Sequence, residues 1–145
     1  MYDAILLPVD GSDPSDEAVA HAGALGAQFD ATVHVLNVVE LPTEAVNAGA
    51  GGATSNVIEA LHDEAEELVT DAVDDLPEGV DVTDVVLEGY PAAAIREYAA
   101  DNDVDLIVMG THGRTGLERY LLGSTTERVV RSAERPVLTV GGAED

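Results

Sequence analysis

Glycine, serine and arginine residues gather in one stretch of the sequence, from Met109 to Thr126. Glycine tolerates positive φ and lets a ligand approach the backbone closely, so that N–H groups can point at an anion. Ser124 and Glu127 have the spacing of a capping box, which predicts that a helix begins here and presents its positive end. The pattern therefore predicts a site for phosphate groups. The spacing of its glycines and serine is Gly110-x2-Gly113-x9-Gly123-Ser124.

The charges of the chain favour an anionic ligand at the same place. The six basic residues are all arginine, against 29 acidic residues and a formal net charge of −23. Five arginines lie between Gly110 and Arg135, where three glutamates accompany them, so this segment carries +2 and the rest of the chain −25. A chain so acidic elsewhere is not expected to bind nucleic acid or an anionic membrane. One alternative stays open, in which the stretch is a long loop that binds nothing and its arginines solvate the last helix.

Composition also indicates the environment of the protein. An acidic surface without lysine is typical of adaptation to concentrated salt, where screening removes the self-repulsion, so we expect a halophilic protein. The chain has no cysteine, which excludes disulfides and thiol-ligated metals and is compatible with a reducing interior. The N-terminus lacks a basic region, and no apolar run approaches the length of a membrane span. These features predict a cytoplasmic location.

Apolar runs and turn residues predict alternating strands and helices. Short apolar runs indicate strands at residues 4–9, 32–39, 82–87, 105–109 and 136–140. Helices between them are expected to begin at an Asp13 cap, at a capping box of Asn56 and Glu59, at Pro91 and at Ser124. Such alternation predicts an α/β fold, a doubly wound five-stranded parallel sheet with helices on both faces. The carboxyl ends of the first and fourth strands would then meet in the ligand crevice.

The length of 145 residues predicts a single domain, residues 1–145. Residues 40–55 are rich in glycine and contain Pro42, so they predict a flexible loop. Residues 141–145 predict a frayed tail.

Four segments of the chain resemble the universal stress protein family, in its ATP-binding subgroup. They are the glycine stretch, I-L-L-P-V-D-G-S from Ile5, V-H-V-L-N-V-V from Val33, and R-P-V-L-T-V from Arg135. The resemblance implies a Rossmann-like fold of the adenine nucleotide alpha hydrolase-like kind, with ATP in the crevice. It also implies a homodimer that pairs through the last strand, from Pro136 to Val140, whose apolar edge natural proteins seldom leave open.

The resemblance assigns parts of the nucleotide to particular residues. The Asp10 carboxylate would accept hydrogen bonds from the ribose hydroxyls, and the backbone of Val38 would pair with the adenine edge. From their place at the ends of the first and fourth strands, we also expect Pro8 and Met109 to line the apolar part of the pocket, although as core residues they need no ligand. For Asp10 an alternative stays open, an Asx-turn that only precedes the next helix. The resemblance implies that Gly110, Gly113, Gly123 and Ser124 wrap the ribose and phosphates. We add His112, Arg114 and Thr125 as candidate nucleotide-binding residues.

Missing residues exclude several other kinds of site. A P-loop needs a lysine, which the chain lacks, and a dinucleotide fold needs G-x-G-x-x-G after the first strand, where one glycine stands. A phospho-receiver domain would also need a lysine, and no G-x-S-x-G nucleophile elbow is present. His21, His34 and His62 have no metal-ligand spacing, so we expect Mg²⁺ or Mn²⁺ to arrive on the nucleotide phosphates and not at a site built by the protein.

We therefore expect an ATP-binding universal stress protein that acts as a nucleotide-dependent sensor or regulator in the stress response, with ADP or AMP as other candidate ligands. Two alternatives remain open: a dimeric interaction module of the same fold that binds no nucleotide, and a slow ATPase. His112 is the one candidate to orient a water molecule, and nothing nearby in the sequence orients His112. We assign no catalytic residue and expect slow hydrolysis at most.

Overall fold

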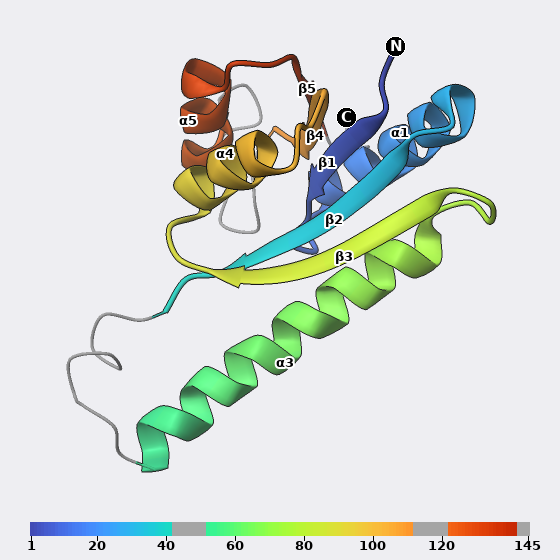
Figure 1. Cartoon of the computed structure of the whole chain (residues 1–145). Helices are drawn as coiled ribbons and strands as arrows, with labels where there is room; N and C mark the ends of the chain where they lie inside the picture. The colour runs from blue at the N-terminus through green and yellow to red at the C-terminus, as the bar shows by residue number, and fades with distance from the viewer. Residues whose placement is uncertain (42–51, 112–121, 142–145) are drawn as a thin grey trace.

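Strands and helices alternate along the chain (Figure 1). The computed structural model describes residues 1–41, 52–111 and 122–141. The strands are β1 (Ala4–Pro8), β2 (Thr32–Val39), β3 (Asp81–Glu88), β4 (Leu106–Gly110) and β5 (Val137–Val140). The helices are α1 (Asp13–Phe29), α3 (Gly52–Asp75), α4 (Pro91–Asp101) and α5 (Ser124–Ser132). Each predicted strand is present, and β2 has the predicted bounds.

The five strands form one parallel sheet in the order β3-β2-β1-β4-β5. The chain proceeds from β1 outward to β3 on one side, then returns for β4 and β5 on the other. This reversal makes the junction of β1 and β4 the topological switch point, outside which open α/β sheets bind ligands. Ile5 of β1 lies beside Leu106 of β4, so the predicted doubly wound sheet and its central strand pair are confirmed.

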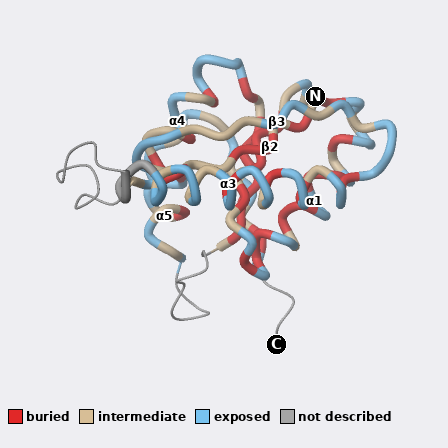
Figure 2. Tube along the Cα trace, turned by 90° about the horizontal axis from the view of Figure 1, so that it is seen from below, coloured by how far each residue is buried: buried red, intermediate tan, exposed pale blue. Residues whose placement is uncertain are grey.

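Helices cover both faces of the sheet (Figure 1). On one face, Ile5 and Leu7 of β1 and Val33 of β2 pack with residues of α1 and α3. On the other face, Leu6 and Leu36 pack with residues of α4 and α5. The three central residues of β1, Ile5, Leu6 and Leu7, thus enter opposite core layers in turn and are all buried, which explains why this strand is a continuous apolar run. Figure 2 shows the buried residues along the strands, with exposed residues on the outer sides of the helices.

The starts of α1 and α3 differ from the sequence predictions. Ser12, and not Asp13, is the N-cap of α1: its Oγ accepts a hydrogen bond from the Ser15 N–H at 3.2 Å. Ser12 and Asp13 are adjacent and both can cap a helix. The turn after β1 places Ser12 at the N-cap position. The predicted capping box at Asn56 is wrong, because α3 already begins at Gly52. No proline separates these positions, so the helix continues toward the N-terminus.

The predicted loop and tail lie largely outside the described part of the chain. Of the loop expected at residues 40–55, residues 42–51 are outside it and residues 52–55 belong to α3. The expected tail is outside it from residue 142 onward. Among the described residues, none of the helices combines the length and the apolar character that a membrane crossing requires.

Candidate functional site

A continuous set of contacts brings the candidate residues together at the carboxyl edge of the sheet. The Asp10 N–H donates to Ser15 Oγ at 3.1 Å. The backbone N of Ser15 lies 2.9 Å from the point that a Cβ on Gly110 would occupy. The Gly110 carbonyl accepts a 2.8 Å hydrogen bond from Thr126 Oγ1 in the first turn of α5. The start of α1, the end of β4 and the start of α5, which follows Gly123, therefore meet in one place.

The turn after β1 holds the backbone and the carboxylate of Asp10. Asp10 Oδ1 accepts a hydrogen bond from the Ser12 N–H at 3.0 Å. With the bond from the Asp10 N–H to Ser15 and the Ser12 cap, this makes a small network among three residues, of which Ser12 and Ser15 are buried. The Asx-turn that we considered for Asp10 is therefore present. A turn of this kind fixes the direction of the carboxylate, which is also what a ligand-binding acid requires.

The end of β2 approaches the same turn through a residue that sequence reasoning missed. Asn37 Nδ2 donates to the Val9 carbonyl at 2.6 Å, and the Val9 N–H donates to the Leu36 carbonyl at 2.9 Å. Val38 faces the other side of the sheet and packs, half-buried, in the core layer beneath α4 and α5. The sequence signal for Asn37 is its polar side chain near the end of the otherwise apolar β2, where His34 is the other polar residue after Thr32.

The two candidate residues at the end of β4 are buried. Met109 is 5% exposed and packs in the core layer beneath α4 and α5. A Cβ on Gly110 would lie 2.8 Å from the carbonyl carbon and the Cβ of Pro14 in α1. The absence of a side chain at Gly110 is therefore explained by close packing of α1 on β4, without reference to a ligand. Pro8, the other candidate for the apolar part of a pocket, is half-buried at the end of β1.

The start of α5 differs from the predicted capping box. Gly123 is the N-cap, with φ −65° and ψ 161°, and no side chain caps the first turn. Ser124 is instead the first helical residue and is exposed, while Thr125 is half-buried. Thr126 is buried, because its hydroxyl is directed at the Gly110 carbonyl. A helix start without a side-chain cap presents backbone N–H groups of its first turn for another partner.

The helix start of α1 has the opposite electrostatic character. Its first turn carries Asp13 and Asp16, and its cap is the buried Ser12 hydroxyl. Burial, followed by the negative charges of Asp75, Asp13, Asp10 and Glu17, raises the pKa of the Asp16 carboxyl. Another anion beside these carboxylates would be repelled. The first turn of α5 contains one acid, Glu127, so phosphate is favoured at α5 over α1.

Three candidate residues, His112, Gly113 and Arg114, lie outside the described residues. The segment that contains them is bounded on both sides by hydrogen bonds. The Thr111 N–H donates to the Val140 carbonyl at 2.9 Å, and the Gly123 N–H donates to the Thr111 carbonyl at 2.7 Å. Thr111 and Gly123 therefore lie side by side, between the end of β5 and the start of α5.

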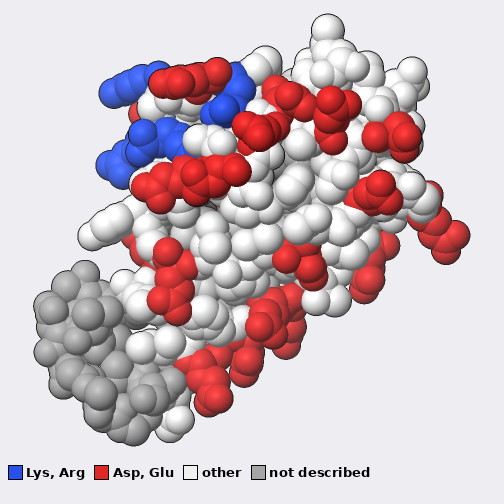
Figure 3. Space-filling model, viewed as in Figure 1, with Lys and Arg blue, Asp and Glu red and all other residues white. Residues whose placement is uncertain are grey.

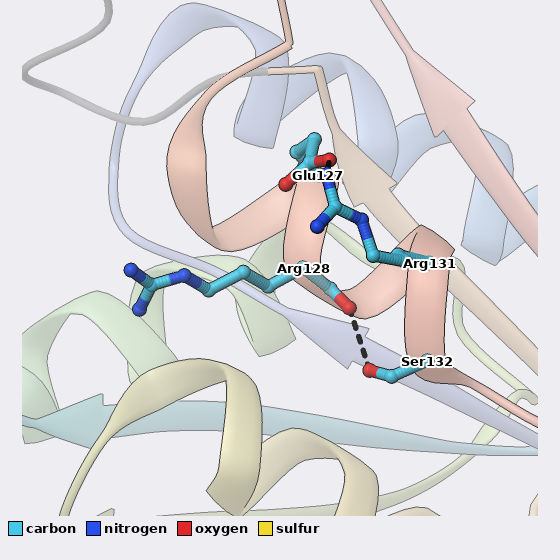
Figure 4. Close-up of polar contacts among 4 residues, drawn as sticks. All are labelled: Glu127, Arg128, Arg131 and Ser132. Atoms are coloured by element: carbon cyan, nitrogen blue, oxygen red, sulfur yellow. Dashed lines mark hydrogen bonds and ion pairs between the residues drawn. The ribbon is translucent and has the colours of Figure 1, made fainter.

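Basic side chains of the described residues gather on one part of the surface. Figure 3 shows them over α4 and α5, whereas acidic side chains are spread over the rest of the visible face. Arg131 pairs with Glu127 one turn earlier, and Figure 4 shows Arg128 extending away from that pair. The Ser132 hydroxyl donates to the Arg128 carbonyl at 2.6 Å, and Arg135 Nε donates to the Val104 carbonyl at 2.8 Å. Arg131 and Arg135 therefore have partners within the protein.

Within the described part of the chain, no group of three histidine, aspartate or glutamate side chains is placed to hold a metal ion. His34 Nδ1 lies 2.7 Å from the Tyr98 hydroxyl, and burial lowers the pKa of His34. His62 Nε2 lies 2.5 Å from Glu88 Oε2. Both histidines thus have partners at separate places in the fold.

The sequence is similar to universal stress proteins over nearly its whole length. A model of the universal stress protein family matches residues 1–141. Universal stress protein MJ0531 of Methanocaldococcus jannaschii is 43% identical over 141 residues, which cover 97% of this chain and 82% of that protein. Universal stress protein MJ0577 of the same organism is 33% identical over 154 residues, with coverage of 97% and 95%.

Solved structures agree with the sequence comparisons. The structure of the MJ0577 protein matches with a TM-score of 0.87 at 32% identity, and covers 100% of this chain and 99% of that one. A universal stress protein solved in complex with cAMP matches with a TM-score of 0.66 at 25% identity, with coverage of 98% and 99%. The fold is thus that of universal stress proteins, and a structural neighbour binds an adenine nucleotide.

Proposed function

Because the chain belongs to the universal stress protein family, we propose that it binds ATP at the carboxyl edge of its sheet and acts as a nucleotide-dependent sensor or regulator in the stress response. The observation that carries the proposal is the convergence of Asp10, Gly110 and the start of α5 at the topological switch point. These are the positions at which the sequence predicts ribose and phosphate contacts. A family neighbour solved with cAMP supports an adenine nucleotide as the ligand.

Each part of the nucleotide is assigned to a different element. The adenine edge pairs with the backbone of Val38, beside the apolar surface of Pro8 at the end of β1. The ribose hydroxyls donate to the carboxylate of Asp10, whose direction the Ser12 N–H fixes. The phosphates lie at the start of α5, where Ser124 and Thr125, which follow the N-cap Gly123, offer backbone N–H groups and hydroxyls.

A divalent cation, Mg²⁺ or Mn²⁺, comes with the nucleotide in this proposal. The described residues supply no set of three metal ligands, so the phosphates hold the ion. When bound, the cation neutralises phosphate charge, which matters beside a chain of formal net charge −23.

Binding without metabolic turnover fits this site. Phosphoryl transfer requires a positioned nucleophile and a group that activates or orients it. The sequence offers His112 for this role, and it lies outside the described residues. We propose that bound ATP acts as a signal and that hydrolysis is slow at most.

A homodimer through β5 completes the proposal. β5 is an outer strand of the sheet, and its Leu138 side chain is exposed. An open apolar edge strand favours pairing with another chain. Light scattering in molar salt tests this assembly, and a mass equal to the 15.0 kDa of one chain would contradict it.

The ligand can be identified directly. The protein is purified from its own cells in molar salt, and acid is used to release any bound small molecule for mass spectrometry. We expect ATP, or its products ADP and AMP. Release of a ligand without adenine would contradict the proposal.

A further inference from the structure

We infer that Asn37 is a positioning residue that sets the Asp10 carboxylate relative to the end of β2, and that it thereby controls selection of ribose over deoxyribose. The inference rests on the proposed nucleotide site. It concerns a residue that neither the composition nor the spacing of the glycine stretch identifies.

Asn37 joins the two strand ends that hold the proposed adenine and ribose contacts. It immediately precedes Val38 on β2, and its Nδ2 donates at 2.6 Å to the carbonyl of Val9, which immediately precedes Asp10. The ladder between β1 and β2 ends with the pair of Pro8 and Leu36. The Asn37 side chain therefore connects β1 and β2 beyond the last pair of the ladder. It joins the residue before Val38 to the residue before Asp10.

The start of α1 holds Asp10 from the other side. The Asp10 N–H donates to Ser15 Oγ at 3.1 Å, and Asp10 Oδ1 accepts from the Ser12 N–H at 3.0 Å. Ser15 is 4% exposed and Ser12 is 9% exposed, so water competes little for these bonds. Asn37 and Ser15 thus fix the backbone on both sides of one peptide unit, and Ser12 fixes the side-chain direction.

A fixed acceptor is what discrimination between ribose and deoxyribose requires. A carboxylate held at the ribose hydroxyls accepts a charged hydrogen bond from ATP. A deoxynucleotide that lacks the hydroxyl cannot make this bond, so it binds more weakly. Once Asp10 is loosened, it can turn away, and both nucleotides bind mainly through the phosphates at α5. Loss of Asn37 should therefore weaken the binding of ATP more than the binding of the deoxynucleotide, and so lower the ratio of the two affinities.

The experiment measures the dissociation constants of ATP, 2′-deoxy-ATP and 3′-deoxy-ATP by calorimetry in molar KCl with Mg²⁺. The variants are Asn37→Ala, Ser15→Ala and Asn37→Asp, the last of which keeps the size of the side chain and replaces the donor. Asp10→Ala defines the selectivity that remains without the carboxylate. Tyr98→Phe is the matched control, because it removes another half-buried side-chain hydrogen bond, to His34, on the opposite face of β2. Circular dichroism confirms that each variant is folded.

We expect the wild type to prefer ATP over at least one deoxynucleotide by roughly ten- to a hundredfold, the ratio that one charged hydrogen bond supplies. Asn37→Asp and Ser15→Ala should each reduce this ratio at least about threefold toward that of Asp10→Ala, and Tyr98→Phe should keep it. In the Asp10→Ala background, Asn37→Asp should not change the ratio further.

The possible failures are distinct. If the wild type binds none of the three nucleotides, the proposed function itself is wrong. If it binds ATP but the Asn37 and Ser15 variants keep the full ratio, only the positioning role is wrong. A ratio that falls equally in Tyr98→Phe would show general loosening of the fold and would also overturn the role of Asn37.

Discussion

The Thr126 hydroxyl donates a 2.8 Å hydrogen bond to the Gly110 carbonyl, and so ties the first turn of α5 to the last residue of β4. The two residues are 16 positions apart, and the glycine stretch lies between them. Thr126 is 3% exposed, so this bond is made away from water. This buried side chain therefore helps to set the position of the proposed phosphate site relative to the sheet, together with the bond from the Gly123 N–H to the Thr111 carbonyl.

Replacing Thr126 should show this dependence. Thr126→Val keeps the shape and removes the donor, so it should lower the free energy of unfolding by about 1 to 3 kcal/mol, the usual cost of an unpaired buried polar group. Urea denaturation in molar KCl measures the change. Thr126→Ser retains the hydroxyl and should keep part of the stability that Thr126→Val loses. A valine variant as stable as the wild type would show that the bond does not hold α5.

Gly110 is predicted to resist even the smallest substitution. A Cβ at this position would meet the backbone carbon and Cβ of Pro14 at 2.8 Å, atoms that cannot move aside as the end of a flexible side chain can. Gly110→Ala should therefore cost about 1 to 3 kcal/mol of stability or more. Gly141→Ala is the control, because no heavy atom lies within 4 Å of its added Cβ. Equal melting temperatures for Gly110→Ala and Gly141→Ala would refute the packing explanation.

Periodicity made much of the fold predictable. β2 has the predicted bounds from Thr32 to Val39, because its apolar residues fill two core layers and turn residues flank it. The adjacency of β1 and β4 followed from the alternation of strands and helices, which admits few topologies. The position of Asp10 at the switch point follows from the same alternation.

Contacts between distant segments could not be predicted in this way. The role of Gly110 depends on Pro14, which is distant in sequence and arrives only when α1 packs on β4. Ser124 has the spacing of a capping box, but in the structure Gly123 is the N-cap and Ser124 is the first helical residue. The buried hydrogen bond from Thr126 to Gly110, which joins distant segments, accompanies this earlier helix start. Asn37 is a polar residue in a largely apolar strand. Its partner, the Val9 carbonyl, comes within reach only when β2 pairs with β1, so the sequence alone does not identify the contact.

The Asp105 carboxylate should give the stability a defined pH dependence. Its Oδ2 accepts the N–H groups of Asp3 at 2.8 Å and Ala4 at 3.0 Å, and these bonds lower the pKa of Asp105. Since the folded-state pKa lies below the unfolded value of about 3.9, the ionised group stabilises the fold above that pH. The contribution is lost as the pH falls through the lowered pKa.

Asp105→Asn should therefore be less stable than the wild type near neutral pH, and the difference should shrink as the pH falls below about 4. Melting temperatures measured across this range test the expectation. Asp63→Asn, which changes an exposed acid of α3, serves as the control. A difference between wild type and Asp105→Asn that stays constant with pH would contradict the assigned hydrogen bonds.

Salt should stabilise this protein, and Asp16 should account for part of the effect. Asp16 is exposed, yet slight desolvation and then the neighbouring charge of Asp75 raise its pKa, so its ionised form weakly destabilises the fold at neutral pH. Asp16→Asn should raise the melting temperature, and more at about 0.1 M than at about 3 M KCl, where charges are screened. Glu66→Gln, an exposed change on α3, should give a smaller gain. A wild-type melting temperature equal in both salts would contradict the salt-adapted interpretation.

Calorimetric titration of ATP into the wild type and Asp10→Ala, in molar KCl with Mg²⁺, tests whether ATP occupies the switch point with its ribose on Asp10. We expect saturable binding to the wild type and an affinity lower by roughly tenfold or more in Asp10→Ala, from the loss of one charged hydrogen bond. No binding to the wild type, or the same affinity in both proteins, would contradict this expectation.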